Sequence, residues 1–160
     1  MKLKDLTKLV SSFLLVAIAA TIGSLVTFQA IPTWYAALNK TVISPPDWVF
    51  APAWTILYIL MAMALFLIWR EEPTKKQKEA LQLFGAQLVS NAAWSIIFFG
   101  THLIFTAFIE IILLLTLIIW TTIWFYRVNK IAGYLMIPYI LWVGFAAILN
   151  FSTWLVNQPR

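Results

Sequence analysis

The sequence contains no cysteine and only one histidine, His102. Without cysteine the chain can form neither a disulfide framework nor a thiolate metal site, and it has no cysteine nucleophile. A single histidine cannot build a metal site by itself, so we expect no bound metal. Charged residues make up only 11% of the chain. They are too few to cover the surface of a water-soluble domain, and this shortage favours an integral membrane protein.

Apolar residues account for 62% of the chain and form five long runs, at residues 9–30, 49–69, 81–100, 103–126 and 131–156. Each run is long enough to cross a bilayer, which takes about 20 residues. Because a spanning segment must satisfy its own backbone hydrogen bonds, each run is expected to be a helix. The sequence therefore predicts an all-α integral membrane protein, a five-transmembrane-helix bundle that forms one domain over residues 1–160.

Lysine and arginine are distributed unevenly over the segments between the runs. With five spans, the N-terminus and the second and fourth connections share one side and hold nine basic residues, whereas the other side holds only Lys40 and Arg160. Because basic residues gather on the cytoplasmic side, we expect a cytoplasmic N-terminus and an external C-terminus in a prokaryotic cell membrane. Lys2 and Lys4 resemble the start of a signal peptide, but the length of the first run favours a retained helix. The net charge of +5 then reflects topology, and no basic stripe predicts nucleic-acid binding.

The first connection and the helix after it carry the densest group of aromatic residues. Trp54 and Tyr58 lie at i and i+4 on one helical face. Trp54 lies more than one turn inside its run, deeper than an interfacial aromatic belt explains. For Trp34 and Trp48 such a belt remains an alternative to ligand binding. The candidate ligand-binding residues here are Trp34, Tyr35, Lys40, Trp48, Phe50, Trp54 and Tyr58.

Polar side chains recur on one stripe of the third run, at Gln87, Asn91 and Trp94. Amides are costly in hydrocarbon unless they are paired. The stripe therefore either bonds neighbouring helices or lines a pocket, and the sequence leaves both open. Glu110 is the only carboxyl group inside any run. One carboxyl is weak support for a proton pump, which normally needs several.

The fifth run has a similar stripe, with Trp142, Ala146 and Asn150 at i, i+4 and i+8. A small alanine between a tryptophan and an asparagine leaves room beside an aromatic plane, although close helix packing would also explain it. Tyr139 lies one residue after Pro138, and both precede this stripe. Pro138 removes one backbone hydrogen bond and predicts a kink.

These groups stand in the order and at the spacing of three motifs of the translocator protein (TspO/MBR) family. Its bacterial members are called tryptophan-rich sensory proteins, and the resemblance covers nearly the whole chain. The motifs are Trp34-Tyr35-x-x-Leu38-x-Lys40 with Pro45-Pro46-x-Trp48-Val49-Phe50-x-Pro52-x-Trp54-x-x-Leu57-Tyr58, then Gln87-x-x-x-Asn91-x-x-Trp94-Ser95-x-x-Phe98-Phe99, and Pro138-Tyr139-x-x-Trp142-x-x-Phe145-Ala146-x-x-Leu149-Asn150.

The resemblance implies a membrane receptor, often a homodimer, with a pocket under the first connection. That pocket would bind porphyrins, haem-like tetrapyrroles and drug-like aromatic molecules, with no required cofactor. Trp54 and Trp142 match tryptophans linked to light-dependent breakdown of protoporphyrin, and they are the candidate catalytic residues. Lys40 is the expected partner of the porphyrin propionates. With no cysteine and His102 in a turn, axial ligation of haem iron is not expected.

Other functional interpretations of the same residues remain open. A transporter of porphyrins or other small hydrophobic metabolites would use the same pocket. A porphyrin-degrading enzyme would rely on the two candidate tryptophans, because the sequence has no conventional catalytic motif. A sensor subunit with a role in tetrapyrrole regulation or stress would signal through the short second connection.

Some positions depart from the family pattern. Thr41, Ile43 and Ala62 stand where the family often has proline, an aromatic residue and glycine. The sterol-recognition segment of the animal members needs a tyrosine at the place of Phe151 and a basic residue soon after it. Here no basic residue follows until Arg160, so cholesterol recognition is not expected.

Two pairs of small residues one turn apart are candidates for a homodimer contact. Ala19 and Gly23 form the first pair, and Ala86 and Ser90 form the second. Such pairs let two helices approach closely, either within the chain or between two copies.

Overall fold

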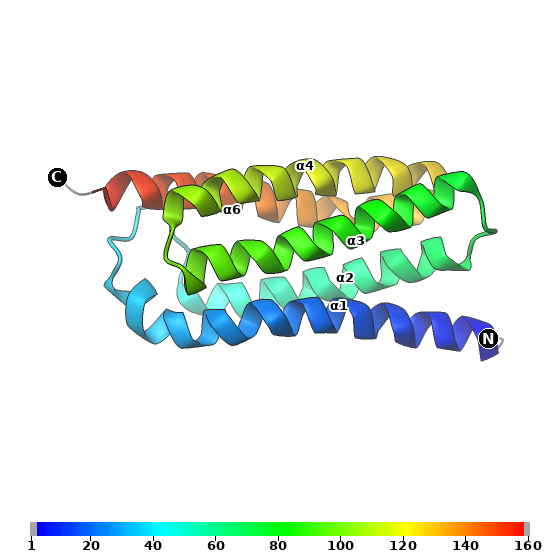
Figure 1. Cartoon of the computed structure of the whole chain (residues 1–160), viewed down its shortest axis with the longest axis horizontal. Coiled ribbons are helices and arrows are strands. Elements are labelled where there is room, and N and C mark those ends of the chain that lie inside the picture. Colours follow the sequence, from blue (N-terminus) through cyan, green and yellow to red (C-terminus); the bar gives the residue numbers. More distant parts are fainter. Residues whose placement is uncertain (1–2, 159–160) are drawn as a thin grey trace.

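The computed structural model describes residues 3–158 and contains helices and no strand over that range. The long helices run side by side as one bundle (Figure 1). They are α1 (Leu3–Ala30), α2 (Phe50–Arg70), α3 (Lys75–Ser95), α4 (Ile104–Val128) and α6 (Ile137–Val156). The shorter helical segments are η1 (Ile31–Tyr35), η2 (Asp47–Val49), η3 (Ile96–Gly100) and α5 (Lys130–Leu135). Together they make five spans that are long and apolar enough to cross a membrane, which confirms the predicted five-helix membrane bundle.

Two helices begin earlier than predicted, α1 at Leu3 and α3 at Lys75. The side chain of Thr74 caps α3 by accepting a 3.1 Å hydrogen bond from the backbone N–H of Gln77. The charged residues that follow Thr74 thus form the first turns of α3, although hydropathy assigned them to a connection. Hydropathy marks only the apolar part of a helix, whereas capping decides where the helix begins.

The fifth span is broken between α5 and α6, as the proline in it predicted. Pro138 lies in the first turn of α6, and the helix before it ends at Leu135. Met136 donates its N–H to the Gly133 carbonyl at 3.1 Å, and its own carbonyl accepts from Ile140.

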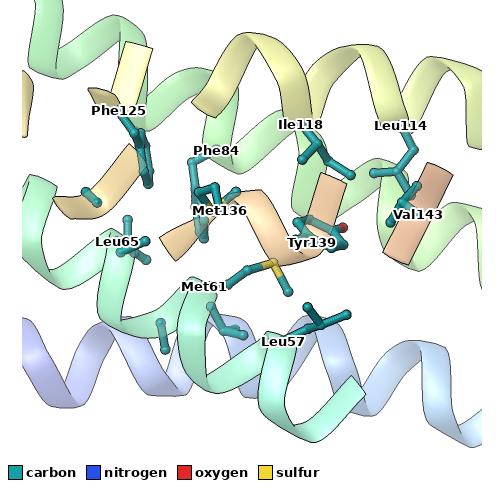
Figure 2. Packing of buried hydrophobic residues seen from close by; sticks show 14 of the residues in the cluster. Leu57, Met61, Leu65, Phe84, Leu114, Ile118, Phe125, Met136, Tyr139 and Val143 are labelled. Atoms are coloured by element: carbon teal, nitrogen blue, oxygen red, sulfur yellow. The ribbon is translucent and has the colours of Figure 1, made fainter. Parts of the chain in front are cut away.

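The hydrophobic core fills the half of the bundle that is nearest the α2–α3 connection. Figure 2 shows Met61 and Leu65 of α2 facing Met136 at the start of the last helix. Phe84 of α3 stacks on Phe125 of α4 with ring centroids 5.4 Å apart. Among these side chains, Met61 and Leu65 belong to the later half of α2, and Phe84 belongs to the earlier half of α3. The opposite halves of both helices are left to form the cavity described below.

The connection between η1 and η2, which we call the first loop (residues 36–46), is tied to the end of α6. Asn157 accepts a 2.9 Å hydrogen bond from the Asn39 N–H and returns one of 3.0 Å to the Asn39 carbonyl. Within the loop, Ser44 donates its N–H to the Thr41 carbonyl at 3.0 Å. The first loop and the C-terminus lie at the same end of the bundle, opposite the N-terminus (Figure 1).

One candidate pair of small residues serves packing inside the chain. Gly23 of α1 faces Ser95 of α3, and an added Cβ at Gly23 would lie 3.0 Å from the Ser95 hydroxyl oxygen. Ala19 is buried as well. In the second pair, the Ser90 hydroxyl donates a 2.6 Å hydrogen bond to the Glu110 carboxylate. The lone intramembrane carboxyl group thus has a hydroxyl partner on the neighbouring helix.

Candidate ligand-binding site

A cavity of about 400 Å³ lies beneath the first loop, between α1, α2, α3 with η3, and α6. Its volume is in the range of small-molecule sites, about 300–1,000 Å³. Eight of the predicted ligand-binding residues line it: Tyr35, Phe50, Trp54, Tyr58, Trp94, Trp142, Ala146 and Asn150. The structure thus brings together residues from the first, second, third and fifth spans.

Both candidate catalytic tryptophans face this cavity. Trp54 of α2 stacks on Tyr58 with ring centroids 5.3 Å apart and an interplanar angle of 29°. Trp142 of α6 meets Phe50 edge-on at 6.0 Å. These are favourable geometries for aromatic pairs, so neighbouring rings hold each indole in place.

The α3 wall is built around Trp94, which stacks on Phe98 with centroids 5.3 Å apart. The Trp94 indole N–H donates a 3.1 Å hydrogen bond to the side-chain oxygen of Asn150. The Asn150 amide in turn donates to the Ile104 carbonyl at 2.9 Å. Asn150 therefore lines the cavity with an amide whose two ends are already bonded, and it fixes the orientation of the Trp94 ring.

Asn91 and Tyr139, both predicted to bind ligand, lie behind the cavity wall rather than in it. Both are almost fully buried. The Tyr58 hydroxyl donates to the Asn91 side-chain oxygen at 3.3 Å, and the Asn91 amide donates to the Tyr139 hydroxyl at 2.8 Å. This chain joins α2, α3 and α6 and holds Tyr58 at the cavity. The sequence left open whether the polar stripe of the third run bonds neighbouring helices or lines a pocket. In the structure Asn91 bonds neighbouring helices, and Trp94 lines the cavity.

Gln87 is fully buried one turn before Asn91 and does not line the cavity. Among residues 3–158, no group forms a hydrogen bond with either polar atom of its side chain. A buried amide without a partner costs about 1–3 kcal/mol. No contact in the described part of the chain accounts for this cost.

Lys40 and Asp47 form an ion pair at the mouth of the cavity. The Lys40 ammonium lies 2.7 Å from one carboxylate oxygen of Asp47 and 3.0 Å from the other. It also lies 4.6 Å from the centre of the Tyr35 ring, in cation–π geometry. Asp47 lines the cavity and Lys40 does not. The predicted cation is therefore present at the mouth, but it is already neutralised by a carboxylate that the sequence reasoning left out.

The other two predicted tryptophans lie outside the cavity. Trp34 stacks on His102 with ring centroids 4.2 Å apart and meets Phe98 edge-on at 5.5 Å. His102 adopts a φ of 61°, which aids the tight turn between η3 and α4. Trp48 is 74% exposed, as the aromatic-belt alternative expects. Trp34 thus packs the outside of the η3 wall, and Trp48 has no place in the cavity.

Sequence reasoning missed the wall formed by α1. Ala20, Gly23, Ser24, Thr27 and Phe28 all line the cavity. Their spacing repeats at three and four residues, which is the period of one helical face. That spacing was the signal available, but small residues on a membrane helix usually indicate helix packing. Phe98 and Phe99 of η3 also belong to the lining.

Residues 3–158 contain no group of three or more histidine, aspartate or glutamate side chains that could hold a metal ion. Aromatic faces and small side chains dominate the walls, with a few bonded polar groups among them. Such a site suits a flat, largely apolar molecule.

The bundle and its cavity define a multi-pass α-helical membrane protein with a small-molecule-sized site between its helices. Residues 12–155 match the TspO/MBR family, and the chain belongs to that family. It is similar to the tryptophan-rich protein TspO of Archaeoglobus fulgidus, with 38% identity over 153 residues that cover 96% of this chain and 99% of the relative. The tryptophan-rich sensory protein of Cereibacter sphaeroides is 37% identical over 128 residues, covering 79% and 78%. The translocator protein of Homo sapiens is 36% identical over 127 residues, covering 78% and 75%.

Proposed function

We propose that this protein is a membrane receptor for porphyrins and related tetrapyrroles, which it binds in the cavity beneath the first loop. The observation that carries the proposal is the set of indole rings on three walls, Trp54 from α2, Trp94 from α3 and Trp142 from α6. A flat conjugated ring gains from stacking on such faces and from burying its apolar surface. Binding by the ring faces needs no metal or cofactor from the protein.

The proposal includes the light-driven first step of porphyrin breakdown, an electron transfer from an indole to the bound porphyrin. An excited porphyrin can take one electron from a nearby indole, which leaves an oxidised indole and a reduced porphyrin. Trp54 and Trp142 line the same cavity from two different helices, α2 and α6. This position supports the proposal that either indole is the donor.

The receptor proposal is tested by titrating the purified protein with protoporphyrin in the dark. We expect saturable binding that quenches tryptophan fluorescence. Trp142→Ala removes one wall and should weaken binding about tenfold, from lost burial and stacking. Trp120→Ala is the matched control, because Trp120 is exposed on α4 and lies outside the cavity. Linear, non-saturating uptake, or equal losses in both variants, would contradict the proposal.

A transporter of porphyrins or other small hydrophobic metabolites is the second candidate. It is favoured by one observation, that the cavity shares wall residues with a second hollow on the membrane-facing side of α1 and α2. Flux of protoporphyrin into sealed proteoliposomes would separate the two. A receptor binds without net flux, whereas a transporter moves more than one equivalent per protein.

We also propose that the N-terminal end of the bundle is cytoplasmic, in a prokaryotic cell membrane. The N-terminus and the second and fourth connections carry nine of the basic residues. The two termini lie at opposite ends of the bundle (Figure 1). A reporter that works only outside the cytoplasm should be active when fused after Arg160. Activity of a cytoplasm-only reporter at that position would reverse the assignment.

A homodimer through α3 completes the proposal. Ala86 is exposed, and an added Cβ at the neighbouring Gly85 would meet nothing within 4 Å among the described residues. Val89, one turn on, is also exposed. Small residues on an outer face let two copies approach closely in a membrane. Native mass measurement in mild detergent should show a dimer that Ala86→Phe weakens, and a strict monomer in every detergent would contradict it.

A further inference from the structure

A second hollow, which we call the α1–α2 groove, runs along the membrane-facing side of these two helices. It measures about 500 Å³, and all its lining residues belong to α1 (from Phe13 to Phe28) or to α2 (from Thr55 to Ala62). Phe13, Leu25, Phe28 and Ile59 are exposed, and Phe28 shows 73% of its surface. Because the bundle is a membrane protein, this exposed apolar face lies against lipid acyl chains.

The groove and the cavity share part of their walls. Five residues line both: Ala20, Ser24 and Phe28 of α1 and Thr55 and Tyr58 of α2. Three of these side chains are small: Ala20, Ser24 and Thr55. The cavity and the groove therefore adjoin along a wall between α1 and α2 that is built partly of small side chains.

The threonines along this path present little polarity to a passing molecule. The Thr55 hydroxyl donates to the Ala51 carbonyl at 2.8 Å, and the Thr21 hydroxyl donates to the Ala17 carbonyl at 2.8 Å. Each hydroxyl proton is therefore bonded within its own helix. An apolar molecule that moves along the path does not have to break these bonds.

By contrast, hydrogen bonds and an ion pair hold the first loop in place at the water-facing end of the bundle. The first loop is held to α6 by the paired hydrogen bonds between Asn39 and Asn157. Next to them, Lys40 and Asp47 are joined at 2.7 Å. A ligand that arrived from water past the loop would have to displace these contacts.

We propose that a ligand reaches the cavity from within the bilayer, through the gap between α1 and α2, and not past the first loop. The proposal builds on the proposed function by naming the route and the state of the ligand, a flat apolar molecule dissolved among acyl chains. Residues that line only the groove, such as Ala17 and Thr21, then control the rate of access without touching the bound ligand.

The chain lacks cysteine, so one engineered thiol on the far wall reports access to the cavity. Ala146→Cys places it on α6, and the probe is N-(1-pyrenyl)maleimide supplied in lipid vesicles. Thr21→Trp fills the groove and should slow labelling of this thiol about tenfold, because access would then need a conformational change. Thr116→Trp is the matched control, since Thr116 is also exposed and bonds back to its own helix, at the Ile112 carbonyl. Asn157→Ala frees the first loop and should leave the rate unchanged.

Each other pattern overturns the proposal. Faster labelling in the Asn157→Ala protein with no change in Thr21→Trp would place access at the loop. Equal slowing in Thr21→Trp and Thr116→Trp would trace the effect to general membrane perturbation. If Thr21→Trp fails to fold by circular dichroism, Ala17→Phe tests the same groove from a neighbouring position. The labelling needs no porphyrin, so a failure of protoporphyrin to bind would refute the receptor proposal separately.

Discussion

Replacing Asp47 with asparagine should strengthen the binding of porphyrins that carry carboxylates. Asp47 lines the cavity and holds the Lys40 ammonium at 2.7 Å. A propionate that approaches Lys40 must displace this carboxylate or lie beside a like charge, which is unfavourable. The Asp47→Asn substitution keeps the shape of the side chain and removes its charge, so Lys40 becomes available to the ligand.

The exposure of the pair limits the size of the effect. The Lys40 and Asp47 side chains are 36% and 49% exposed, so water and salt screen their attraction. Exposed ion pairs of this kind contribute about 0–1 kcal/mol. Since about 1.4 kcal/mol is tenfold in affinity, releasing Lys40 should tighten binding by up to about fivefold. The gain should shrink as the salt concentration rises.

The assay compares two porphyrins in the dark, protoporphyrin and one whose propionates are replaced by alkyl groups. Asp47→Asn should tighten only the first, and Lys40→Gln should weaken only the first. Asp5→Asn is the control, because Asp5 lies in the first turn of α1 at the other end of the bundle. If Asp47→Asn weakens both porphyrins equally, the ion pair merely holds the first loop and Lys40 does not meet the propionates.

The remaining predictions concern the cavity floor, the indoles and one helix cap. Ala146→Thr narrows the cavity one turn after Trp142, and a misfit of about 1–3 kcal/mol should lower protoporphyrin affinity by roughly one to two decades. Binding isotherms with helix content checked by circular dichroism measure this, and equal affinities would remove Ala146 from the site. Replacing both Trp54 and Trp142 with phenylalanine should preserve binding in the dark and slow the bleaching of bound protoporphyrin under light. If the double variant bleaches protoporphyrin at the wild-type rate, the two indoles only line the cavity. Asn129→Ala loses the cap of α5 and a 2.8 Å bond to Glu71, so the free energy of unfolding should fall by about 1–2 kcal/mol. A thermal denaturation midpoint in detergent that equals that of the wild type would show that the cap does not hold α5.

Local properties of the chain were enough to predict the number and kind of the helices. The shortage of charge and the five apolar runs predicted the spans, because a bilayer accepts only segments that bond their own backbone. Pro138 predicted the break in the fifth span, since a missing N–H acts at its own position. The start of α3 was misplaced, because the Thr74 cap is a local signal that hydropathy does not register.

The division of the polar and aromatic stripes between core and cavity depended on the tertiary structure. The spacing in the sequence showed that Asn91 and Trp94 share a face of α3, but it does not predict which residues each of them contacts. In the fold Asn91 meets Tyr139 and is buried, whereas Trp94 faces the cavity. The pairing of Lys40 with Asp47 likewise depends on how the first loop folds back over the bundle.

The sequence by itself determined the membrane class and the set of helical faces, because both follow from hydrophobicity and the helical period. Only the tertiary structure decided that the small face of α1, including Ala20 and Ser24, forms a wall that the cavity shares with the α1–α2 groove. Small side chains leave space wherever the opposite helix does not fill it. The distance and direction of the neighbouring helix decide whether that space is filled. At Gly23 the side chain of Ser95 approaches closely, whereas at other small residues of α1 the space remains as part of a hollow.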